Sequence, residues 1–255
     1  MTRHVWLLLV GLVILPTSFL ATQVSAKEVT VAIGWNKPPY VVHDTDSGFE
    51  LELTRYILSQ LNHKMTVIYI PFGRTPSLLK NGQVDIGLTM NTHHDINPDW
   101  LSKPYVAYQN VAISLVSNDI VLTTVDALRY HSVVAFQTAK TVLGERYANA
   151  VSNRPDYLEL PDQQNQVSLL LRGSVDVAIM DENIFRHFRQ TVTPDLREKA
   201  VRIHRLFPKS LYAAGIVDDD LRFAFNRELA LALADGTYSQ LLQQFNLIDL
   251  LNRPD

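Results

Sequence analysis

Aromatic side chains that follow a strand-like segment are the first residues of this chain able to bind a small molecule. Residues 27–33 read as a strand, which opens into Trp35 and the proline-stiffened Pro38-Pro39-Tyr40. Phe49 follows at the start of a predicted helix. Aromatic rings commonly form the apolar wall of a ligand site. We expect Trp35 to stack on a ligand, whereas Tyr40 and Phe49 either contact the ligand or hold the loop on the helix.

Two charged side chains could hold the opposite ends of a zwitterionic or acidic ligand. Arg74 stands at a helix start, where its charge opposes the helix dipole and adds nothing to helix stability. It is either an anion anchor at the rim of a cleft or a solvated surface arginine. Asp181 follows another strand and could bind a ligand ammonium, cap the next helix, or do both. Neither residue is expected in the core.

Polar side chains also follow other strands of the predicted sheets. The carboxyl ends of parallel strands meet at one edge of a sheet, and ligands bind there. We therefore expect a ligand-binding cleft in which two polar loops meet Asp181. The residues expected to contact the ligand from these loops are Thr89, Asn91, Thr92, Gln137, Lys140 and Thr141.

Catalytic and metal-binding patterns are weak in this sequence. It has no Gly-x-Ser-x-Gly, His-Glu-x-x-His or phosphate-loop motif, and Asp181 or Glu182 would have to serve as a general acid or base. His93 and His94 precede Asp95, but no third ligand stands at a suitable spacing. We therefore expect a protein that is not an enzyme and that uses no metal or cofactor.

The elements that must position these side chains alternate between strands and helices, which predicts an α/β architecture with largely parallel sheets. Strands are expected over 29–33, 67–70, 84–88, 111–116, 132–136 and 175–180, and helices over 50–61, 75–80, 142–150 and 163–171. Residues 78–89 and 169–181 share one pattern of helix, Asn-Gly or Arg-Gly, Val-Asp, strand and polar loop. This weak internal symmetry predicts two similar lobes that face each other.

The N-terminus predicts export. Arg3, the apolar stretch 5–20 and the small residues Val24-Ser25-Ala26 make residues 1–26 a secretory signal peptide. Pro16-Thr17-Ser18 interrupts the apolar stretch short of the roughly 20 residues that a membrane anchor needs. Removing 26 of the 255 residues would leave 229, enough for two compact lobes. The chain has no cysteine, which excludes disulfides and a lipid-modified cysteine, so we expect a soluble periplasmic protein.

The charge balance argues against a nucleic-acid partner. The chain carries 23 basic and 26 acidic side chains, and loss of Arg3 with the signal peptide would leave 22 basic ones. Nucleic acids and anionic membranes attract basic patches, which this slightly acidic chain does not favour. We therefore expect a small polar ligand and no nucleic acid.

Six short motifs stand in the order and spacing typical of one known family. They are Pro38-Pro39-Tyr40, Gly48-Phe49-Glu50-Leu51-Glu52-Leu53, Leu79–Asp85, Ser102-Lys103-Pro104-Tyr105, Val175–Asp181 and Asp235-Gly236-Thr237-Tyr238. Through them nearly the whole mature chain resembles the family 3 periplasmic solute-binding proteins of polar amino-acid ABC transporters. The resemblance implies a periplasmic-binding-protein-like clamshell of two α/β lobes joined by two crossover strands, near 111–116 and 201–207. One lobe would comprise 27–112 and 207–255, and the other 113–206.

The resemblance also implies a function. A monomer of this kind would capture a small polar molecule, an amino acid or a related organic acid, between its lobes and deliver it to the membrane permease of an ABC transporter. Alternatives are a receptor that reports its ligand to a membrane sensor protein, and a dehydratase built on the same fold. The Pro-x-x-Arg sequence at 71–74 resembles that of stand-alone relatives without an obvious transporter.

Two positions depart from the pattern of the family. Its members commonly hold a ligand carboxylate with an arginine shortly after a Thr-x-Thr loop, and the ammonium with an aspartate of the other lobe. Asp181 stands in the place of that aspartate, but His94 takes the arginine's place and the second-lobe turn reads Gln137-Thr138-Ala139-Lys140. A guanidinium forks onto a carboxylate with two hydrogen bonds, whereas a neutral imidazole offers one donor. The resemblance therefore leaves open whether Arg74 or His94 binds the carboxylate.

Overall fold

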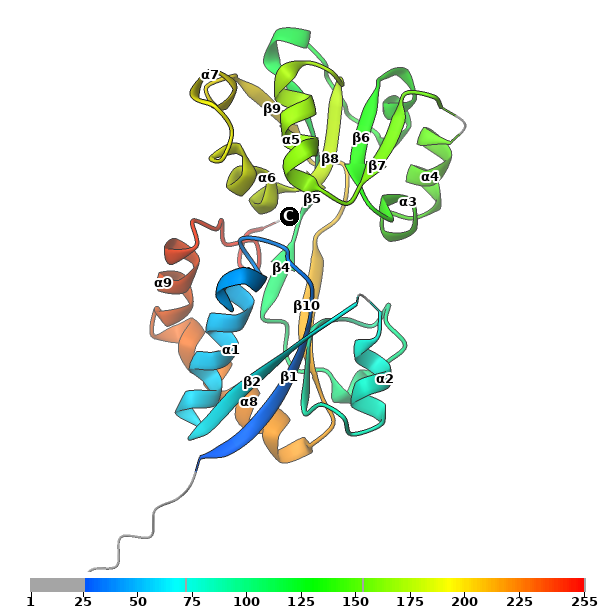
Figure 1. The fold of residues 1–255 in the computed structure, drawn as a ribbon. Coiled ribbons are helices and arrows are strands. Elements are labelled where there is room, and N and C mark those ends of the chain that lie inside the picture. The colour runs from blue at the N-terminus through cyan, green and yellow to red at the C-terminus, as the bar shows by residue number, and fades with distance from the viewer. Residues whose placement is uncertain (1–25, 72, 153, 255) are drawn as a thin grey trace, which may run out of the picture.

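The computed structural model describes residues 26–71, 73–152 and 154–254. They form two α/β lobes, each built on a five-stranded sheet, in a clamshell arrangement (Figure 1). The predicted signal peptide lies outside the described residues, apart from Ala26. In the part of the chain described, no helix is both long and apolar enough to span a bilayer.

The first lobe contains a mixed sheet with strand order β2-β1-β3-β10-β4. These strands are β1 (Lys27–Gly34), β2 (His63–Ile70), β3 (Ile86–Met90), β4 (Val106–Tyr108) and β10 (Ser210–Ile216). Strand β1 runs parallel to β2 and β3, whereas β10 pairs antiparallel with β3 and β4. Its helices are α1 (Phe49–Gln60), α2 (Thr75–Lys80), α8 (Asp219–Ala234) and α9 (Thr237–Gln244). Helices α1, α8 and α9 bury one face of the sheet and α2 covers the other.

The second lobe repeats this plan with strand order β7-β6-β8-β5-β9. Its strands are β5 (Asn110–Leu115), β6 (Val133–Phe136), β7 (Tyr157–Leu160), β8 (Val177–Asp181) and β9 (Val201–His204). Its helices are α3 (Ala139–Val142), α4 (Glu145–Val151), α5 (Gln163–Arg172), α6 (Glu182–Arg189) and α7 (Pro194–Arg197). Short 3-10 turns are η1 (His43–Thr45), η2 (Pro98–Trp100), η3 (Val116–Asn118) and η4 (Val125–Tyr130). In both sheets three parallel strands are followed by an antiparallel one, so the two lobes are similar, as the internal symmetry predicts.

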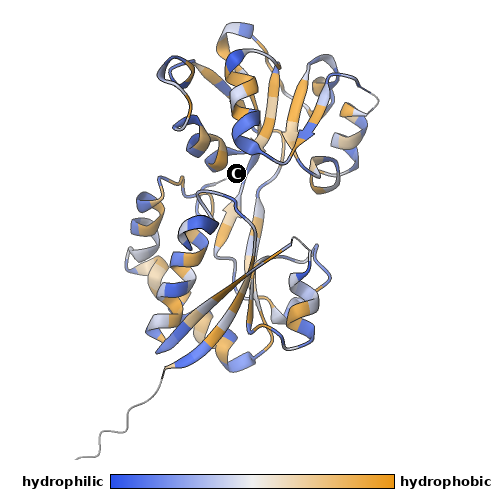
Figure 2. Cartoon of the chain, viewed as in Figure 1, coloured by the Kyte–Doolittle hydropathy of each residue, from blue (hydrophilic) through white to orange (hydrophobic). Residues whose placement is uncertain are grey.

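Most predicted elements are present, with their ends near the expected residues. Hydrophobic residues concentrate in the strands and on the helix faces turned toward them (Figure 2). Gly173 ends α5 in the left-handed conformation, with a φ of 76° that glycine adopts without steric cost. The single helix expected over 142–150 is instead two short helices, α3 and α4. They are separated at Gly144, whose φ of 84° is incompatible with a continuous helix.

The connections between the lobes are shorter than expected. Residues 111–116 are not a free ribbon, because β5 pairs along its length with β8 and β9 of the second sheet. The chain leaves the first sheet after β4, passes through Gln109 and enters β5. It returns over residues 205–209, between β9 and β10. We propose that the lobe boundaries fall at these two connecting segments, Gln109 and residues 205–209.

Candidate functional site

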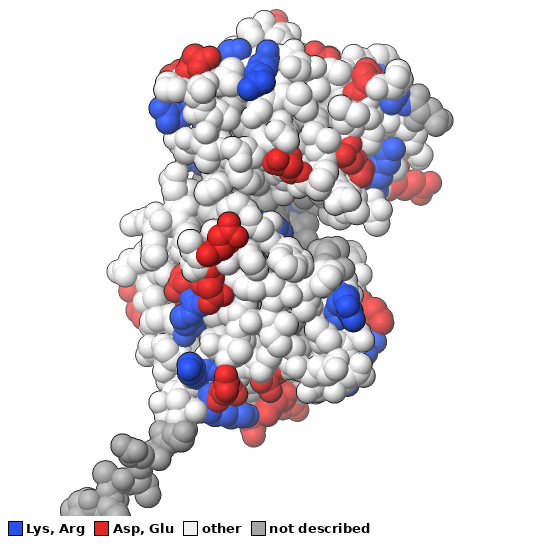
Figure 3. Space-filling model, in the orientation of Figure 1, with Lys and Arg blue, Asp and Glu red and all other residues white. Residues whose placement is uncertain are grey.

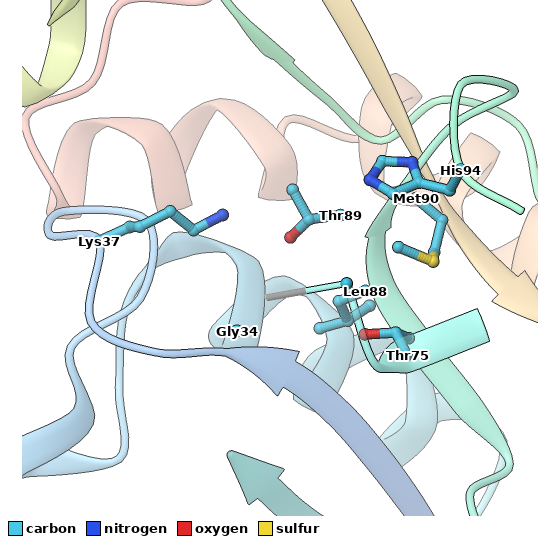
Figure 4. Close-up of a pocket in the computed structure, with 8 residues that line it drawn as sticks. Gly34, Lys37, Thr75, Leu88, Thr89, Met90 and His94 are labelled. Carbon is cyan, nitrogen blue, oxygen red and sulfur yellow. The ribbon is translucent and has the colours of Figure 1, made fainter. Parts of the chain in front are cut away.

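A pocket opens in the first lobe where β1 and β3 end and α2 begins. Figure 4 shows Lys37 reaching across it toward Thr89, with the ring of His94 on the far side. The lining residues are Gly34, Lys37, Gly73, Thr75, Leu88, Thr89, Met90 and His94. The pocket therefore lies at the carboxyl ends of parallel strands, and Figure 3 shows the surface hollowed between the two lobes.

The floor of the pocket is organised by one buried carboxylate. Glu50, in the first turn of α1, is fully buried and accepts hydrogen bonds from three hydroxyl groups. The donors are Thr89 at 2.8 Å, Tyr108 at 2.6 Å and Tyr105. Burial and the charge of Glu50 hold the pKa of both tyrosines well above the usual value, so both phenols remain protonated donors. Glu50 thus fixes the end of β3 and strand β4 to the start of α1.

Thr89 has an unusual backbone conformation at this floor. Its φ is +59°, which is strained for a β-branched residue. Its hydroxyl donates to Glu50, and its backbone N–H donates to the Tyr105 hydroxyl at 3.0 Å. Strained residues held by their surroundings cluster at ligand sites, and Thr89 lines the pocket. Strand β3 extends through Thr89 and Met90, so these residues lie in the strand and not in the loop expected after it.

Lys37 places a partly buried ammonium group in the lining of the pocket. Its Nζ lies 5.0 Å from the ring centroid of Tyr108, which stacks on Tyr40 at 4.2 Å. Within the described residues this ammonium has no hydrogen bond and no ion pair. Burial lowers the pKa of Lys37, while the negative charges of Glu50 and Asp181 oppose that effect.

His94 faces the same space but contributes little positive charge. Its Nδ1 lies 3.1 Å from the backbone nitrogen of Asn91 and 3.3 Å from its oxygen. Burial lowers the pKa of His94. The hydrogen bond with the Asn91 backbone acts to raise this pKa, and the charges of His93 and Lys37 act to lower it further. The imidazole is therefore mostly neutral at neutral pH.

In the second lobe, the carboxylate of Glu159 accepts the backbone N–H groups of the turn at residues 138–140, which faces this pocket across the cleft. Glu159 of β7 accepts the backbone N–H groups of Thr138 at 2.8 Å and Lys140 at 3.1 Å. It also accepts the Tyr157 hydroxyl at 2.7 Å. Burial alone would raise the pKa of Glu159, but these hydrogen bonds from Tyr157, Lys140 and Thr138 outweigh it and the net shift is downward. The turn after β6 therefore already holds a negative charge.

Asp181 joins the two lobes at the hinge. Its carboxylate caps α6 through the N–H groups of Asn183 at 2.9 Å and Ile184 at 3.0 Å. It also accepts the N–H of Gln109 in the first crossover at 2.8 Å and the hydroxyl of Tyr40 at 3.1 Å. Asp181 is only 3% exposed, which differs from the expectation that it lies outside the core. Its contact with a ligand ammonium remains a prediction.

The C-terminal segment reinforces the same junction. The Asn183 side chain donates to the carbonyl of Ile248 at 3.2 Å and accepts its N–H at 2.9 Å. Glu182 binds Arg205 of the second crossover at 2.9 Å and Arg253 near the C-terminus at 3.3 Å. The start of α6 in the second lobe is therefore tied to a segment that follows the last helix of the first lobe (Figure 1).

The titration of Asp181 yields a testable pH dependence. Burial raises its pKa to about 6, although hydrogen bonds from Ile184, Gln109, Tyr40 and Asn183 act in the opposite direction. The unfolded value is about 3.9, so the folded state binds the extra proton between these two values. The Asp181 contribution to the free energy of unfolding should therefore fall as pH rises from about 4 to about 6, and then level off.

Urea denaturation of the native protein and of Asp181→Asn over this pH range checks this expectation. The difference between the two unfolding free energies isolates Asp181 from other carboxylates. A difference that rises with pH, or one that is flat from pH 4 to 6, would contradict the raised pKa.

The other predicted site residues fall into three groups. Trp35 is 53% exposed and packs on His43 at 5.0 Å and on Tyr69 at 6.4 Å, outside the residues that line the pocket. Tyr40 and Phe49 are buried, and Phe49 packs edge-on against Tyr238 at 5.3 Å. Phe49 thus packs α1 on α9, whereas Tyr40 stacks on Tyr108 and donates to Asp181 of the second lobe, and a ligand contact of either residue stays a prediction. The remaining candidates, all at least partly exposed, are Arg74, Asn91, Thr92, Gln137, Lys140 and Thr141.

Glu50 beneath the pocket and Lys37 in its lining were not selected from the sequence. Glu50 stands among the apolar residues Phe49, Leu51 and Leu53, and an acid on the helix face that they bury is the signal that could have revealed it. Lys37 directly precedes Pro38-Pro39 in a stiff loop after a strand, and a charged residue in such a loop is the signal that could have indicated a ligand contact. In the part of the chain that the structure describes, no group of three or more His, Cys, Asp or Glu residues could hold a metal ion.

Comparisons with known proteins agree with this fold. The sequence model of the bacterial extracellular solute-binding proteins, family 3, matches residues 29–247. The histidine-binding periplasmic protein of Escherichia coli strain K12 is 25% identical over 214 residues, covering 78% of each chain.

Two solved structures share the fold. An amino acid ABC transporter substrate-binding protein from Streptococcus pneumoniae, bound to L-arginine, has a TM-score of 0.61 at 20% identity and covers 85% of this chain and 93% of its own. A histidine kinase sensor domain with similarity to periplasmic binding proteins has a TM-score of 0.65 at 17% identity, covering 87% and 96%. The same clamshell thus occurs in a transport protein and in a sensor.

Proposed function

Because the chain belongs to the family 3 bacterial extracellular solute-binding proteins, we propose that it captures an amino acid or a related organic acid between its two lobes. The observation that carries this proposal is the pocket at the ends of β1 and β3, which is lined by an ammonium group and a neutral imidazole. The relatives are binding proteins, and the proposed role is capture without catalysis. The two short passes between the sheets provide the hinge.

Two kinds of membrane protein are candidate partners of the ligand-bound form. We propose delivery to the permease of an ABC transporter, supported by the likeness to the transport protein from S. pneumoniae. The sensor-domain likeness favours the alternative, in which the closed form is read by a membrane signalling protein. Residues 1–26 would direct the chain to the periplasm in either case.

A binding and scattering experiment tests the capture. Calorimetric titration with L-histidine, L-arginine, L-glutamate, L-glutamine and succinate should reveal at least one saturable ligand. Small-angle scattering with that compound should show a smaller radius of gyration, because closure brings the lobes together. Absence of binding by all five compounds would contradict the proposed ligand class. Binding without compaction would leave the ligand class intact and contradict closure.

A further inference from the structure

We propose that Lys37 holds the anionic group of the bound molecule, so that the ligand lies with its negative end on the first lobe. This inference rests on the proposed function and names the residue that binds the anionic group of its ligand. It also assigns the anion contact to a residue other than Arg74 or His94.

The backbone around Lys37 is held in a closed turn at the edge of the pocket. The Lys37 N–H donates to the carbonyl of Val41 at 2.9 Å. Its carbonyl accepts the N–H groups of Tyr40 at 2.9 Å and Val41 at 3.0 Å. This closed turn carries Pro38 and Pro39, which restrict the backbone further. The side chain then lies over Tyr108 and reaches into the pocket (Figure 4).

The two nearest carboxylates do not neutralise Lys37 by contact. The oxygens of Glu50 are engaged by Thr89, Tyr105 and Tyr108. Asp181 accepts four hydrogen bonds at the hinge. Their negative field favours the charged form of the ammonium, yet its three donors are left to other partners. A partly desolvated cation of this kind is a strong site for a carboxylate.

The other basic groups around the pocket are less suited to this task. Lys80 is ion-paired with Asp95 at 2.9 Å. Arg74 is exposed and does not line the pocket, and His94 is mostly neutral. Lys37 is therefore the lining cation that can accept an anionic group.

The turn of the second lobe at residues 138–140 favours a positively charged group of the ligand. Glu159 occupies the backbone N–H groups of the 138–140 turn, so a ligand carboxylate there would meet a like charge. Lys140 lies over the Tyr157 ring at 4.6 Å and offsets this charge only in part. A zwitterion thus gains most when its carboxylate binds Lys37 and its ammonium turns toward the second lobe.

Paired probes test this orientation. L-Histidine and histamine differ by one carboxylate, as do L-arginine and agmatine. Calorimetry on the native protein should give at least a tenfold preference for an amino acid over its decarboxylated partner. Lys37→Met, which keeps the length and apolar stem, should weaken the amino acid roughly 10- to 100-fold and leave the amine unchanged. Lys37→Arg should retain part of the affinity.

Controls separate this inference from the function on which it rests. Lys64→Met removes an exposed lysine of β2 and should bind like the native protein. Three outcomes would overturn the role of Lys37 while leaving capture intact. They are an unchanged affinity for the amino acid in Lys37→Met, a loss of affinity only in a parallel Lys140→Met variant, and equal binding of acid and amine by the native protein. Failure of the native protein to bind any of L-histidine, L-arginine, L-glutamate, L-glutamine and succinate would instead overturn the proposed function. The comparison of acid with amine needs no variant, so equal binding of the two would overturn the role of Lys37 even if Lys37→Met folds poorly, and Lys37→Arg then supplies the second variant.

Discussion

Replacement of Glu50 by alanine is expected to lower the free energy of unfolding by about 3–5 kcal/mol. The substitution removes the acceptor of three buried hydroxyl groups, from Thr89, Tyr105 and Tyr108. Each unsatisfied buried donor costs roughly 1–3 kcal/mol, and relief of carboxylate burial offsets part of the sum. Urea denaturation monitored by circular dichroism measures the change.

Glu52 supplies the matched control for Glu50. It lies two residues away on the same helix, and its partner is Arg55, three residues along the helix surface. Because such partly exposed pairs contribute at most about 1 kcal/mol, Glu52→Ala should have a small effect. A loss below about 1 kcal/mol in Glu50→Ala, or equal losses in the two variants, would show that the hydroxyl cluster does not hold the lobe together.

The hinge carboxylate gives the second large expected effect. Asp181→Ala should lower the free energy of unfolding by about 2–4 kcal/mol, because two N–H groups of α6, the N–H of Gln109 and the hydroxyl of Tyr40 lose their acceptor. Removal of a penalised buried charge keeps the loss below the sum of four hydrogen bonds. Chemical denaturation near pH 7 checks the value.

Asp162 provides the comparison for Asp181 in the same lobe. It caps α5 through the N–H of Asn165 at 3.1 Å, in an exposed position. Asp162→Ala should therefore cost only about 1 kcal/mol, the usual contribution of a helix cap. Similar losses in the two variants would reduce Asp181 to an ordinary cap with no added role at the junction of the lobes.

The two carboxylates have different consequences for ligand capture. Glu50 acts within the first lobe, where it orients the pocket floor beneath Lys37. Asp181 acts between the lobes, because its partners come from the loop after β1, the first crossover and α6. Loss of Glu50 should therefore disturb the site itself, whereas loss of Asp181 should also alter how the lobes are joined.

Local sequence signals determined the elements and the edges on which polar side chains stand. The alternation of strands and helices, the Asn-Gly and Arg-Gly helix ends and the capping aspartate at 181 all depend on residues within a few positions of each other. The polar loops were likewise placed by where strands end. Such features follow from backbone geometry and side-chain periodicity, and they require no knowledge of distant partners.

The chemical state of the site was decided only by the tertiary structure. Glu50 meets Tyr108 across 58 positions of the chain, and Asp181 meets Tyr40 across 141. Glu159 reaches the 138–140 turn because β6 and β7 pair in parallel, which brings the turn after one strand beside the other. Whether a polar residue is satisfied, charged or open to a ligand depends on these long-range neighbours, since burial and hydrogen-bond partners set its energy. For this reason the sequence predicted the edge of each sheet at which a ligand would bind, while the burial of Lys37 over the Tyr108 ring became visible only in the folded lobe.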